Sequence, residues 1–301
     1  MLFRPHPTLP RHLLVASQQE HTVVYDGGYV TTEFWPGYRH DVPGNPGTIS
    51  CAEGHHVAEG MWLRDSTVVD DMLMFWYEKA GALIYEYSEW IGWSAARRHA
   101  RVGNATFGAR LLDGMVRTFE GNLPRYLYNT TEHQCWWQID DRDGMEVSIS
   151  GSGCRPTINA ILFGNAEAIV QVATNVGNTT TATKYKAWAE FAQKATMKLW
   201  NPSINSFAVL SLPPPPGQNP PASLPNDFVQ NSTRCNLDTV RTPHALVGVR
   251  ELLGFVPWYF STGDNPLIPY ERGGDFMPMW EQLFDADGFS AAWGLMTAEK
   301  R

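Results

Sequence analysis

The hydrophobic positions of this chain recur mainly at helical spacing. The clearest case is residues 156–177, where apolar side chains three and four residues apart form one stripe. Pro156 suits a first helical position and Gly177 suits the end of a helix. The pattern therefore predicts a helix whose buried face contains Ile158, Ile161, Leu162, Ile169 and Val172.

A second helical stripe follows directly and ends before Pro202, which cannot continue a helix. The short connection predicts an antiparallel pair with the helix before it. The expected face of this second helix contains Tyr185, Trp188, Ala192, Ala195 and Leu199. Helical spacing also indicates helices from Met61 onward, where residues 67–70 resemble a capping box and Val68, Met72, Phe75 and Trp76 share a face. Further helices are expected over residues 105–120, 238–254 and 277–285.

Alternation of period two is confined to short stretches. Residues 23–35, "VVYDGGYVTTEFW", predict a β-hairpin around Asp-Gly-Gly, and residues 206–212, "SFAVLSL", predict a short strand. Residues 213–227 form a proline-rich stretch, for which a surface loop is a commoner interpretation than a polyproline ligand. We therefore predict an all-α fold of helix pairs over residues 61–301, preceded by an irregular N-terminal apron over residues 1–60 that contains the hairpin.

The composition excludes some classes of protein. The chain has 301 residues, of which 43% are hydrophobic, so it can bury the core of one large domain or of two small ones. Its net charge is -8 and its 23 Lys and Arg residues are scattered, so nucleic acid is not expected as the main partner. No apolar run approaches the roughly 18 residues that a membrane span requires, and we predict no membrane partner. The sequence says nothing of the oligomeric state.

The cysteines and sequons bear on the cellular compartment. Four cysteines lie far apart and suit one or two disulfides or buried thiols, not a zinc site. Four Asn-X-Ser/Thr triplets, at Asn104, Asn129, Asn178 and Asn231, hint at a secretory route. The apolar run at residues 12–16 is too short for a signal peptide, so the chain is expected to be intracellular unless a leader is missing.

One loop concentrates the charged residues. The stretch "DDRDGMEVSISGSG", residues 140–153, contains three aspartates and a glutamate and follows two adjacent tryptophans. A solvated acidic loop is the common explanation for such a stretch, and calcium binding is another, although the spacing departs from an EF-hand loop. A third explanation is glycoside cleavage, which needs a carboxylic acid beside a bound sugar. No histidine cluster predicts a metal site, and no phosphate-binding loop or cofactor motif is present.

An ordered set of segments resembles a known family. These segments are "WLRDS" (62–66), "QIDDRDGMEVSISGSGCRPTIN" (138–159), "RELLGFVPWYF" (250–260) and "DGFSAAWGLMTAEKR" (287–301). Together with the helix pair they resemble the (α/α)6-toroid, or six-hairpin, glycosidases from about residue 51 to the end. The nearest groups are the mannosylglycerate-hydrolase-like and family 63 processing α-glucosidase enzymes, and trehalase is more distant. The resemblance implies an incomplete (α/α)6 toroid.

The resemblance also implies roles for particular residues. In these relatives a Gly-x-Asp segment carries the catalytic acid, which implies that Glu146 is the general acid although it is one methylene longer, with Asp143 as the reserve. Trp62, Arg64 and Asp65 match a segment that often grips sugar hydroxyls, although Arg64 and Asp65 could equally form a structural ion pair. The full set of implied binding residues is Trp62, Arg64, Asp65, Trp136, Trp137, Gln138, Asp140, Asp141, Arg142, Trp258 and Tyr259.

The last third of the chain contributes a further candidate lining at Arg250 and Glu251. We expect Pro257 to break a helix and place Trp258 and Tyr259 in a loop, although aromatic packing at a helix end explains these rings equally well. In the relatives a late glutamate acts as general base, and this chain stops at Arg301 before that position. We therefore expect a carbohydrate substrate and an inverting glycosidase reaction that is feeble in this chain alone. The alternatives are a non-catalytic sugar-binding remnant and a lyase or epimerase on the same fold.

Overall fold

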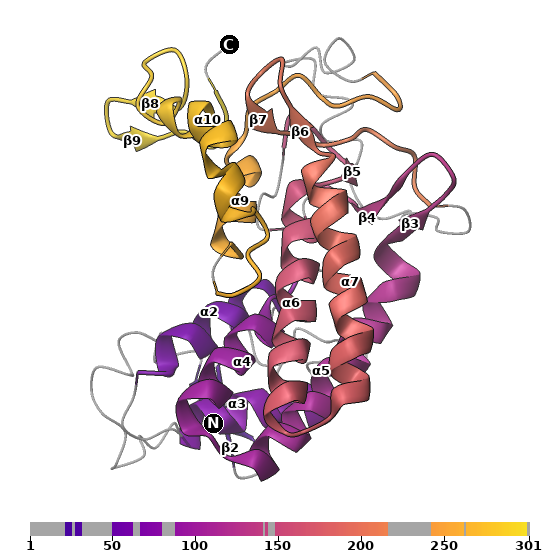
Figure 1. Cartoon of the computed structure of the whole chain (residues 1–301). Helices are drawn as coiled ribbons and strands as arrows, with labels where there is room; N and C mark the ends of the chain where they lie inside the picture. Colours follow the sequence, from indigo (N-terminus) through magenta and orange to yellow (C-terminus); the bar gives the residue numbers. More distant parts are fainter. Residues whose placement is uncertain are drawn as a thin grey trace. The chain divides into compact units, whose positions relative to one another are not determined.

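The computed structural model describes residues 22–25, 28–31, 50–62, 67–79, 88–140, 142–143, 148–215, 242–261 and 263–299. The chain divides into two compact units. The first comprises Met1–Glu120 and Ala168–Ala182, and the second comprises Gly121–Glu167 and Thr183–Arg301. Three long helices, α5, α6 and α7, contribute residues to both units (Figure 1).

The first unit is helical apart from one hairpin. Strands β1 (Thr22–Tyr25) and β2 (Gly28–Thr31) pair antiparallel with Val24 opposite Tyr29, which confirms the predicted hairpin. Its helices are α2 (Ser50–Gly60), α3 (Thr67–Met74) with a π-helical extension (Phe75–Lys79), α4 (Ile91–Val102) and α5 (Ala105–Tyr126).

Helix α2 corrects the prediction that residues up to 60 are irregular. It packs on α4 by a close approach at Gly54, where a Cβ would lie 2.7 Å from the indole ring of Trp90. The Ser94 hydroxyl donates a hydrogen bond of 2.8 Å to the carbonyl of Gly54. The contact depends on a small residue rather than on an apolar stripe, and for that reason hydrophobic spacing did not reveal this helix.

A buried carboxyl lies just before α4. Glu89 is 5% exposed, and its Oε2 accepts a hydrogen bond of 3.0 Å from the backbone N–H of Ile91. Burial raises the pKa of Glu89 to about 8, although the backbone N–H groups of Ile91 and Gly92 lower it in part. The negative charge of Glu89 contributes in turn to raising the pKa of Tyr77, after the larger effect of burial.

Glu89→Gln is expected to change the pH dependence of stability. A folded-state pKa above the unfolded value makes stability fall as pH rises from about 4.5 to about 8. Glutamine keeps an acceptor for the Ile91 N–H but has no proton to lose, so this fall should shrink. The measurement is the urea midpoint of both proteins at about pH 5 and about pH 9. The exposed Glu59 on α2 gives the matched control, Glu59→Gln; equal pH dependence in both variants would contradict the prediction.

The helix pair predicted from residue 156 onward is confirmed. Helix α6 (Pro156–Asn175) begins at Pro156, and α7 (Thr179–Met197) runs antiparallel to it (Figure 1). The turn between them uses Gly177 at a left-handed φ of 78°, a conformation that glycine adopts without strain. The predicted stripe of α6 is buried throughout, with Ile158, Ile161, Leu162, Ile169 and Val172 all at most 6% exposed.

The second unit also contains short antiparallel strands. Strands β3 (Leu127–Asn129), β4 (Gln134–Gln138) and β5 (Gly153–Cys154) form one sheet in the order β3-β4-β5. Strands β6 (Trp200–Asn201) and β7 (Ser206–Phe207) form a second, and β8 (Ser290–Ala291) and β9 (Gly294–Leu295) a third. Leu210 bridges Cys154 on one side and Leu246 on the other, so the strand predicted at 206–212 is present but short.

The helix predicted over residues 238–254 is wrong in the part that the structure describes. From residue 242 the chain is largely extended, and the N–H of Val247 donates a hydrogen bond of 2.9 Å to the carbonyl of Val209. Val247 and Val249 are both buried, a spacing of two that suits an extended segment. A 3-10 turn (Leu252–Phe255) and α9 (Val256–Tyr259) follow. A second 3-10 turn (Tyr270–Phe276) precedes α10 (Met277–Glu281), which is shorter than predicted.

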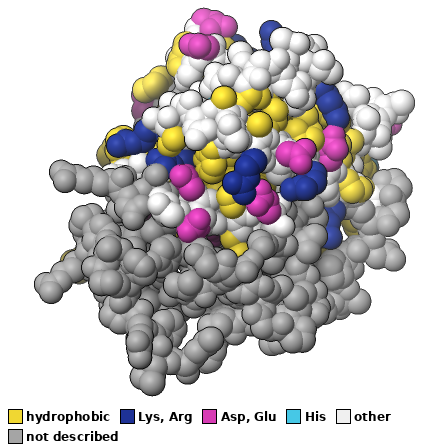
Figure 2. Space-filling view, turned by 90° about the horizontal axis from the view of Figure 1, so that it is seen from below, with side chains coloured by type: hydrophobic (Ala, Val, Ile, Leu, Met, Phe, Trp, Pro, Cys, Tyr) yellow, Lys and Arg dark blue, Asp and Glu magenta, His cyan; other side chains and the backbone are white. Residues whose placement is uncertain are grey.

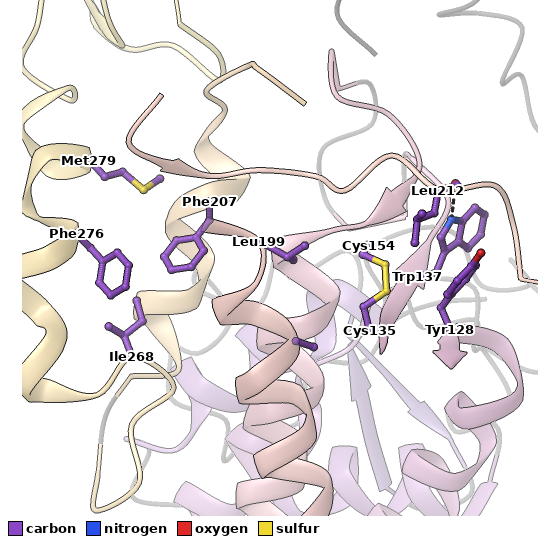
Figure 3. Packing of buried hydrophobic residues seen from close by; sticks show 11 residues of the cluster. Tyr128, Cys135, Trp137, Cys154, Leu199, Phe207, Leu212, Ile268, Phe276 and Met279 are labelled. Carbon is purple, nitrogen blue, oxygen red and sulfur yellow. Dashed lines mark hydrogen bonds between the residues drawn. A yellow bond between two sulfur atoms is a disulfide. The ribbon is translucent and has the colours of Figure 1, made fainter. Parts of the chain in front are cut away.

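The core of the second unit joins the sheet to α7 and to the last third of the chain (Figure 3). A disulfide links Cys135 of β4 to Cys154 of β5, which confirms one predicted disulfide. Cys235 lies outside the described residues, and so does the side chain of Cys51. The other buried members of this cluster are Tyr128, Trp137, Ala195, Leu199, Phe207, Leu212, Ile268, Phe276 and Met279.

The all-α class is confirmed, since the strands are few and short. Closure of the helix pairs into a toroid stays a prediction, and most of the proline-rich stretch, from residue 216, lies outside the described residues. On the face drawn in Figure 2, acidic and basic side chains are interspersed. Among the described helices, none combines the length and apolar character needed to cross a bilayer.

Candidate active site

The acidic loop leaves and returns to the sheet at one place. Gln138 at the end of β4 lies opposite Gly153 at the start of β5, and the disulfide joins the same two strands. The loop between them is therefore closed at its base. Within it, Asp140, residues 142–143 and residues 148–152 are described, whereas Asp141 and residues 144–147, including the predicted acid Glu146, lie outside the described residues.

Arg155 is the centre of the described part of this loop. Its side chain is fully buried, and its guanidinium faces two carboxylates. Nε lies 2.7 Å from Oδ2 of Asp143 and Nη2 donates to Oδ1 at 3.0 Å, so this pair is bidentate. Nη1 lies 3.1 Å from Oδ1 of Asp140 and also donates to the Ser148 hydroxyl and the Gly151 carbonyl. One cation thus binds the loop on both sides of residues 144–147.

The two aspartates carry further hydrogen bonds that fix the loop. Asp143 also accepts a hydrogen bond from the hydroxyl of Thr157 in the first turn of α6, and its side chain is fully buried. Asp140 accepts the backbone N–H of Ser148 at 3.1 Å and its hydroxyl at 2.7 Å. Asp140 thus holds the backbone of Ser148, whereas Asp143 holds the side chains of Arg155 and Thr157, and both carboxylates are paired rather than facing open solvent.

A glutamate from a remote segment holds the end of the same loop. Glu251 is 2% exposed and accepts the N–H of Ile149 at 2.8 Å and that of Ser150 at 3.1 Å. It also accepts the hydroxyl of Ser150. Burial raises the pKa of Glu251, and the hydrogen bonds from Ser150 and Ile149 and the charge of Arg155 offset only part of that rise.

The electrostatics of this cluster favour a permanently charged Arg155. Burial lowers the pKa of its guanidinium, but Asp143, Asp140 and Glu251 together raise it more, so the net pKa is raised. A buried cation with this many hydrogen bonds is stable only while its carboxylate partners remain in place. The cluster therefore acts as one unit that sets the position of the backbone on either side of residues 144–147.

The described part of the loop has the properties of a positioning device rather than of a metal site. Asp140 and Asp143 direct their oxygens at Arg155, and the described residues contain no group of three or more side chains that could hold a metal ion. A catalytic side chain must be held within a fraction of an ångström of its productive position, which requires support of this kind.

Trp136 and Trp137, two of the predicted binding residues, are buried in the protein core. Trp136 is 0% exposed and packs against Trp188 and Phe191 of α7. Trp137 is 4% exposed, and its indole N–H donates to the carbonyl of Leu212 at 3.0 Å (Figure 3). Both rings lie in the core because every residue of β4 after Gln134 is buried, so neither presents the open face that we expected.

The other predicted residues of β4 and the loop take structural contacts. Gln138 is 1% exposed and donates to the carbonyl of Arg142 at 3.1 Å, which tightens the start of the loop. Arg142 itself is half-buried. The hydrogen bond therefore joins the end of β4 to the acidic loop.

Pro257 begins a helix instead of ending one. It lies in the first turn of α9, so Trp258 and Tyr259 are helical, which corrects the expected loop. Trp258 packs among Phe207, Phe276 and Trp280, the aromatic packing that we weighed as the alternative. Tyr259 is 46% exposed and its ring packs edge-on against Phe260.

The remaining candidates are described only in part. Trp62 belongs to the first unit, is 73% exposed, and has the guanidinium of Arg101 4.9 Å from its ring centre. Arg64 and Asp65 lie outside the described residues. Arg250 forms an ion pair with Glu299 at 3.0 Å.

The central residue, Arg155, was not among the predicted site residues. The available signal was a lone arginine between Cys154 and Pro156, directly before a strongly apolar helix. A charged residue at such a position is buried only when it is paired, so it pointed to acidic partners nearby.

Comparison with known proteins places this chain in a family. The sequence model of the mannosylglycerate hydrolase MGH1-like glycoside hydrolase domain matches residues 45–301. The chain belongs to the MGH1-like glycoside hydrolase family. This confirms the resemblance to six-hairpin glycosidases and extends it slightly toward the N-terminus. The matching model is that of a glycoside hydrolase domain.

A solved structure agrees with this assignment. A protein described as a sialidase superposes with a TM-score of 0.73 and is 26% identical, over 99% of this chain. The MGH1-like chain spans about a quarter of that protein, 24% of its length. No curated protein matches the chain significantly in sequence.

Proposed function

We propose that this MGH1-like protein cleaves an α-linked sugar with inversion and that Glu146 is the general acid. The observation that supports this proposal most is the cluster around Arg155. It fixes Asp143 on one side of residues 144–147 and Ser148 on the other by buried hydrogen bonds. A general acid must be held close to its productive position. Firm support on both sides of residues 144–147 is therefore what a loop that carries the proton donor would need.

The same cluster favours Glu146 over the reserve candidate Asp143. Both oxygens of Asp143 accept hydrogen bonds from Arg155, and one also accepts the hydroxyl of Thr157. A carboxylate held in this way has no free oxygen from which to deliver a proton to a sugar. We therefore assign Asp143 to positioning and keep Glu146 as the donor.

In the proposed reaction Glu146 gives its proton to the glycosidic oxygen as the bond to the anomeric carbon breaks. A second carboxylate takes a proton from water, whose oxygen attacks the opposite face of that carbon. Inversion of this kind needs the two carboxyl groups about 6.5–9.5 Å apart. The resemblance expects the second carboxylate beyond Arg301.

Sugar binding is proposed for the remaining residues of the predicted set. Trp62 and Tyr259 are exposed aromatic rings of the kind that stack on sugars. For Arg64, Asp65, Asp141 and Arg142 the family resemblance implies a part in binding. Five other predicted residues are better supported as the packed frame of such a site. Four of them are less than 9% exposed, and Trp258 packs in the aromatic cluster. The five are Trp136, Trp137, Gln138, Asp140 and Trp258.

The test is hydrolysis of a panel of aryl α-glycosides: glucosides, mannosides, galactosides and rhamnosides. We would assay both the 301-residue chain and a form extended by any coding sequence that continues past Arg301. We expect one sugar to be cleaved, with the β-anomer as the first product by proton NMR, and to be cleaved faster by the extended form. Release of the α-anomer first would refute inversion, and no cleavage by either form would refute the activity.

A further inference from the structure

We infer that Asn104, Asn129 and Asn178 are sites of N-glycosylation. The inference is independent of the proposed hydrolase activity. Each asparagine has a threonine two residues later, and both members of each sequon are exposed: Thr106, Thr131 and Thr180 are the partners. The fourth sequon, at Asn231, lies outside the described residues.

In all three asparagines the side-chain amide oxygen accepts a hydrogen bond. Oδ1 of Asn104 accepts the backbone N–H of Phe107 at 3.1 Å, and Oδ1 of Asn178 accepts that of Thr181 at 3.0 Å. Oδ1 of Asn129 accepts a hydrogen bond of 3.2 Å from the side chain of Gln134. In each case the described fold uses the amide oxygen and leaves the amide nitrogen at the surface. The nitrogen is the atom to which a glycan is attached, so a glycan would cost none of these hydrogen bonds.

Two of the sites share one local design. Gly103 and Gly177 end α4 and α6 with left-handed φ angles of 70° and 78°, and the asparagine that follows each caps the next helix. The amide oxygen performs the capping, because it accepts a free N–H of the first helical turn. Attachment at the nitrogen leaves the oxygen available and therefore keeps this cap.

The third site lies in the turn of a hairpin. Asn129 ends β3, and the turn is closed by hydrogen bonds between Thr130 and His133, one from the backbone N–H of each residue. The hairpin continues into β4, which carries the disulfide between Cys135 and Cys154. Disulfides form in the same oxidising compartments in which sequons are glycosylated, so the buried disulfide supports the inference independently of the sequons.

The reaction is a group transfer from a lipid pyrophosphate-linked oligosaccharide. Nδ2 of asparagine forms a bond to the anomeric carbon of the first sugar and loses one proton, while the bond from that carbon to the pyrophosphate oxygen breaks. The lipid pyrophosphate leaves, and no oxidant or reductant is required. The transfer depends on the hydroxyl of the threonine two residues later, which gives a clean way to block it.

The first test uses protein isolated from the cells that naturally make it. Removal of N-glycans by a peptide N-glycosidase in heavy-oxygen water converts a glycosylated asparagine to labelled aspartate, which peptide mass spectrometry detects. We expect label at residues 104, 129 and 178. Each site is judged separately, and an asparagine recovered unlabelled from protein with an intact Cys135–Cys154 disulfide removes that site.

The second test separates glycosylation from capping. Thr106→Ala, Thr131→Ala and Thr180→Ala, each in a form secreted from yeast, should remove one glycan per variant on gels, whereas Thr→Ser at the same positions should retain it. Because Asn104 and Asn178 keep their capping oxygens, the alanine and serine variants at Thr106 and at Thr180 should have the same thermal midpoint when both are made in cells that attach no N-glycans. Unchanged mobility in all three alanine variants would overturn the inference.

Discussion

Arg155→Met is expected to lower the free energy of unfolding by about 3–5 kcal/mol, because removing one partner of a buried ion pair leaves uncompensated charge. The substitution keeps most of the side-chain volume but leaves Asp140 and Asp143 buried without their cation. The measurement is urea denaturation followed by circular dichroism. We expect the helical signal to be lost at a lower urea concentration, with an unchanged dependence of the unfolding free energy on urea concentration.

Another arginine provides a matched control. Arg110 makes the same forked contact with the carboxylate of Glu78, at 2.8–3.0 Å, but both side chains are exposed. Solvent screens such a pair, so Arg110→Met should cost no more than about 1 kcal/mol. Adding Asp140→Asn and Asp143→Asn to Arg155→Met should restore part of the loss. Equal effects of the two arginine variants would contradict the proposed role of burial.

Glu146→Gln is expected to reduce turnover of the best aryl glycoside in the panel by about a hundredfold or more, because a general acid contributes at least that factor. Glutamine has nearly the same shape but cannot donate the proton. The measurement is kcat and KM in the form of the protein that shows activity. A loss in kcat with little change in KM would match a proton donor, whereas a rise in KM alone would indicate a binding residue.

Two further variants make this result specific. Glu146→Asp restores the shorter acid that the resembling enzymes carry, so it should recover more activity than Glu146→Gln. Glu281→Gln changes an exposed glutamate of α10 and should leave turnover unchanged. Activity of Glu146→Gln within about threefold of wild type would remove Glu146 from the mechanism.

The helical part of the fold could be predicted well because its signals are local. Helix α6 combined a proline at its first position, a long apolar stripe and a terminal glycine, and all three were where the pattern placed them. Helix α2 lacked such signals because its contact depends on the small size of Gly54. The segment containing Val247 contained no local signal for its pairing with Val209, since that pairing joins residues far apart in sequence.

The sequence predicted which loop forms the candidate site, but not how the side chains of that loop are arranged. The loop was found because acidic residues are concentrated there, yet the same pattern could not distinguish carboxylates that meet a substrate from those that hold Arg155. The rings of Trp136 and Trp137 illustrate the same limit. Tryptophan suits both a sugar platform and a core, and only the pairing of β4 between β3 and β5 decided for the core.

The reach of Glu251 affects how this protein can mature during synthesis. Its carboxylate binds the backbone of Ile149 from 102 positions further along the chain. On a ribosome, the helices around residue 160 emerge well before that glutamate does. The loop can reach its final form only after residue 251 has been made, so the nascent chain passes through a stage in which these helices have been synthesised and the acidic loop still lacks its hydrogen bonds to Glu251.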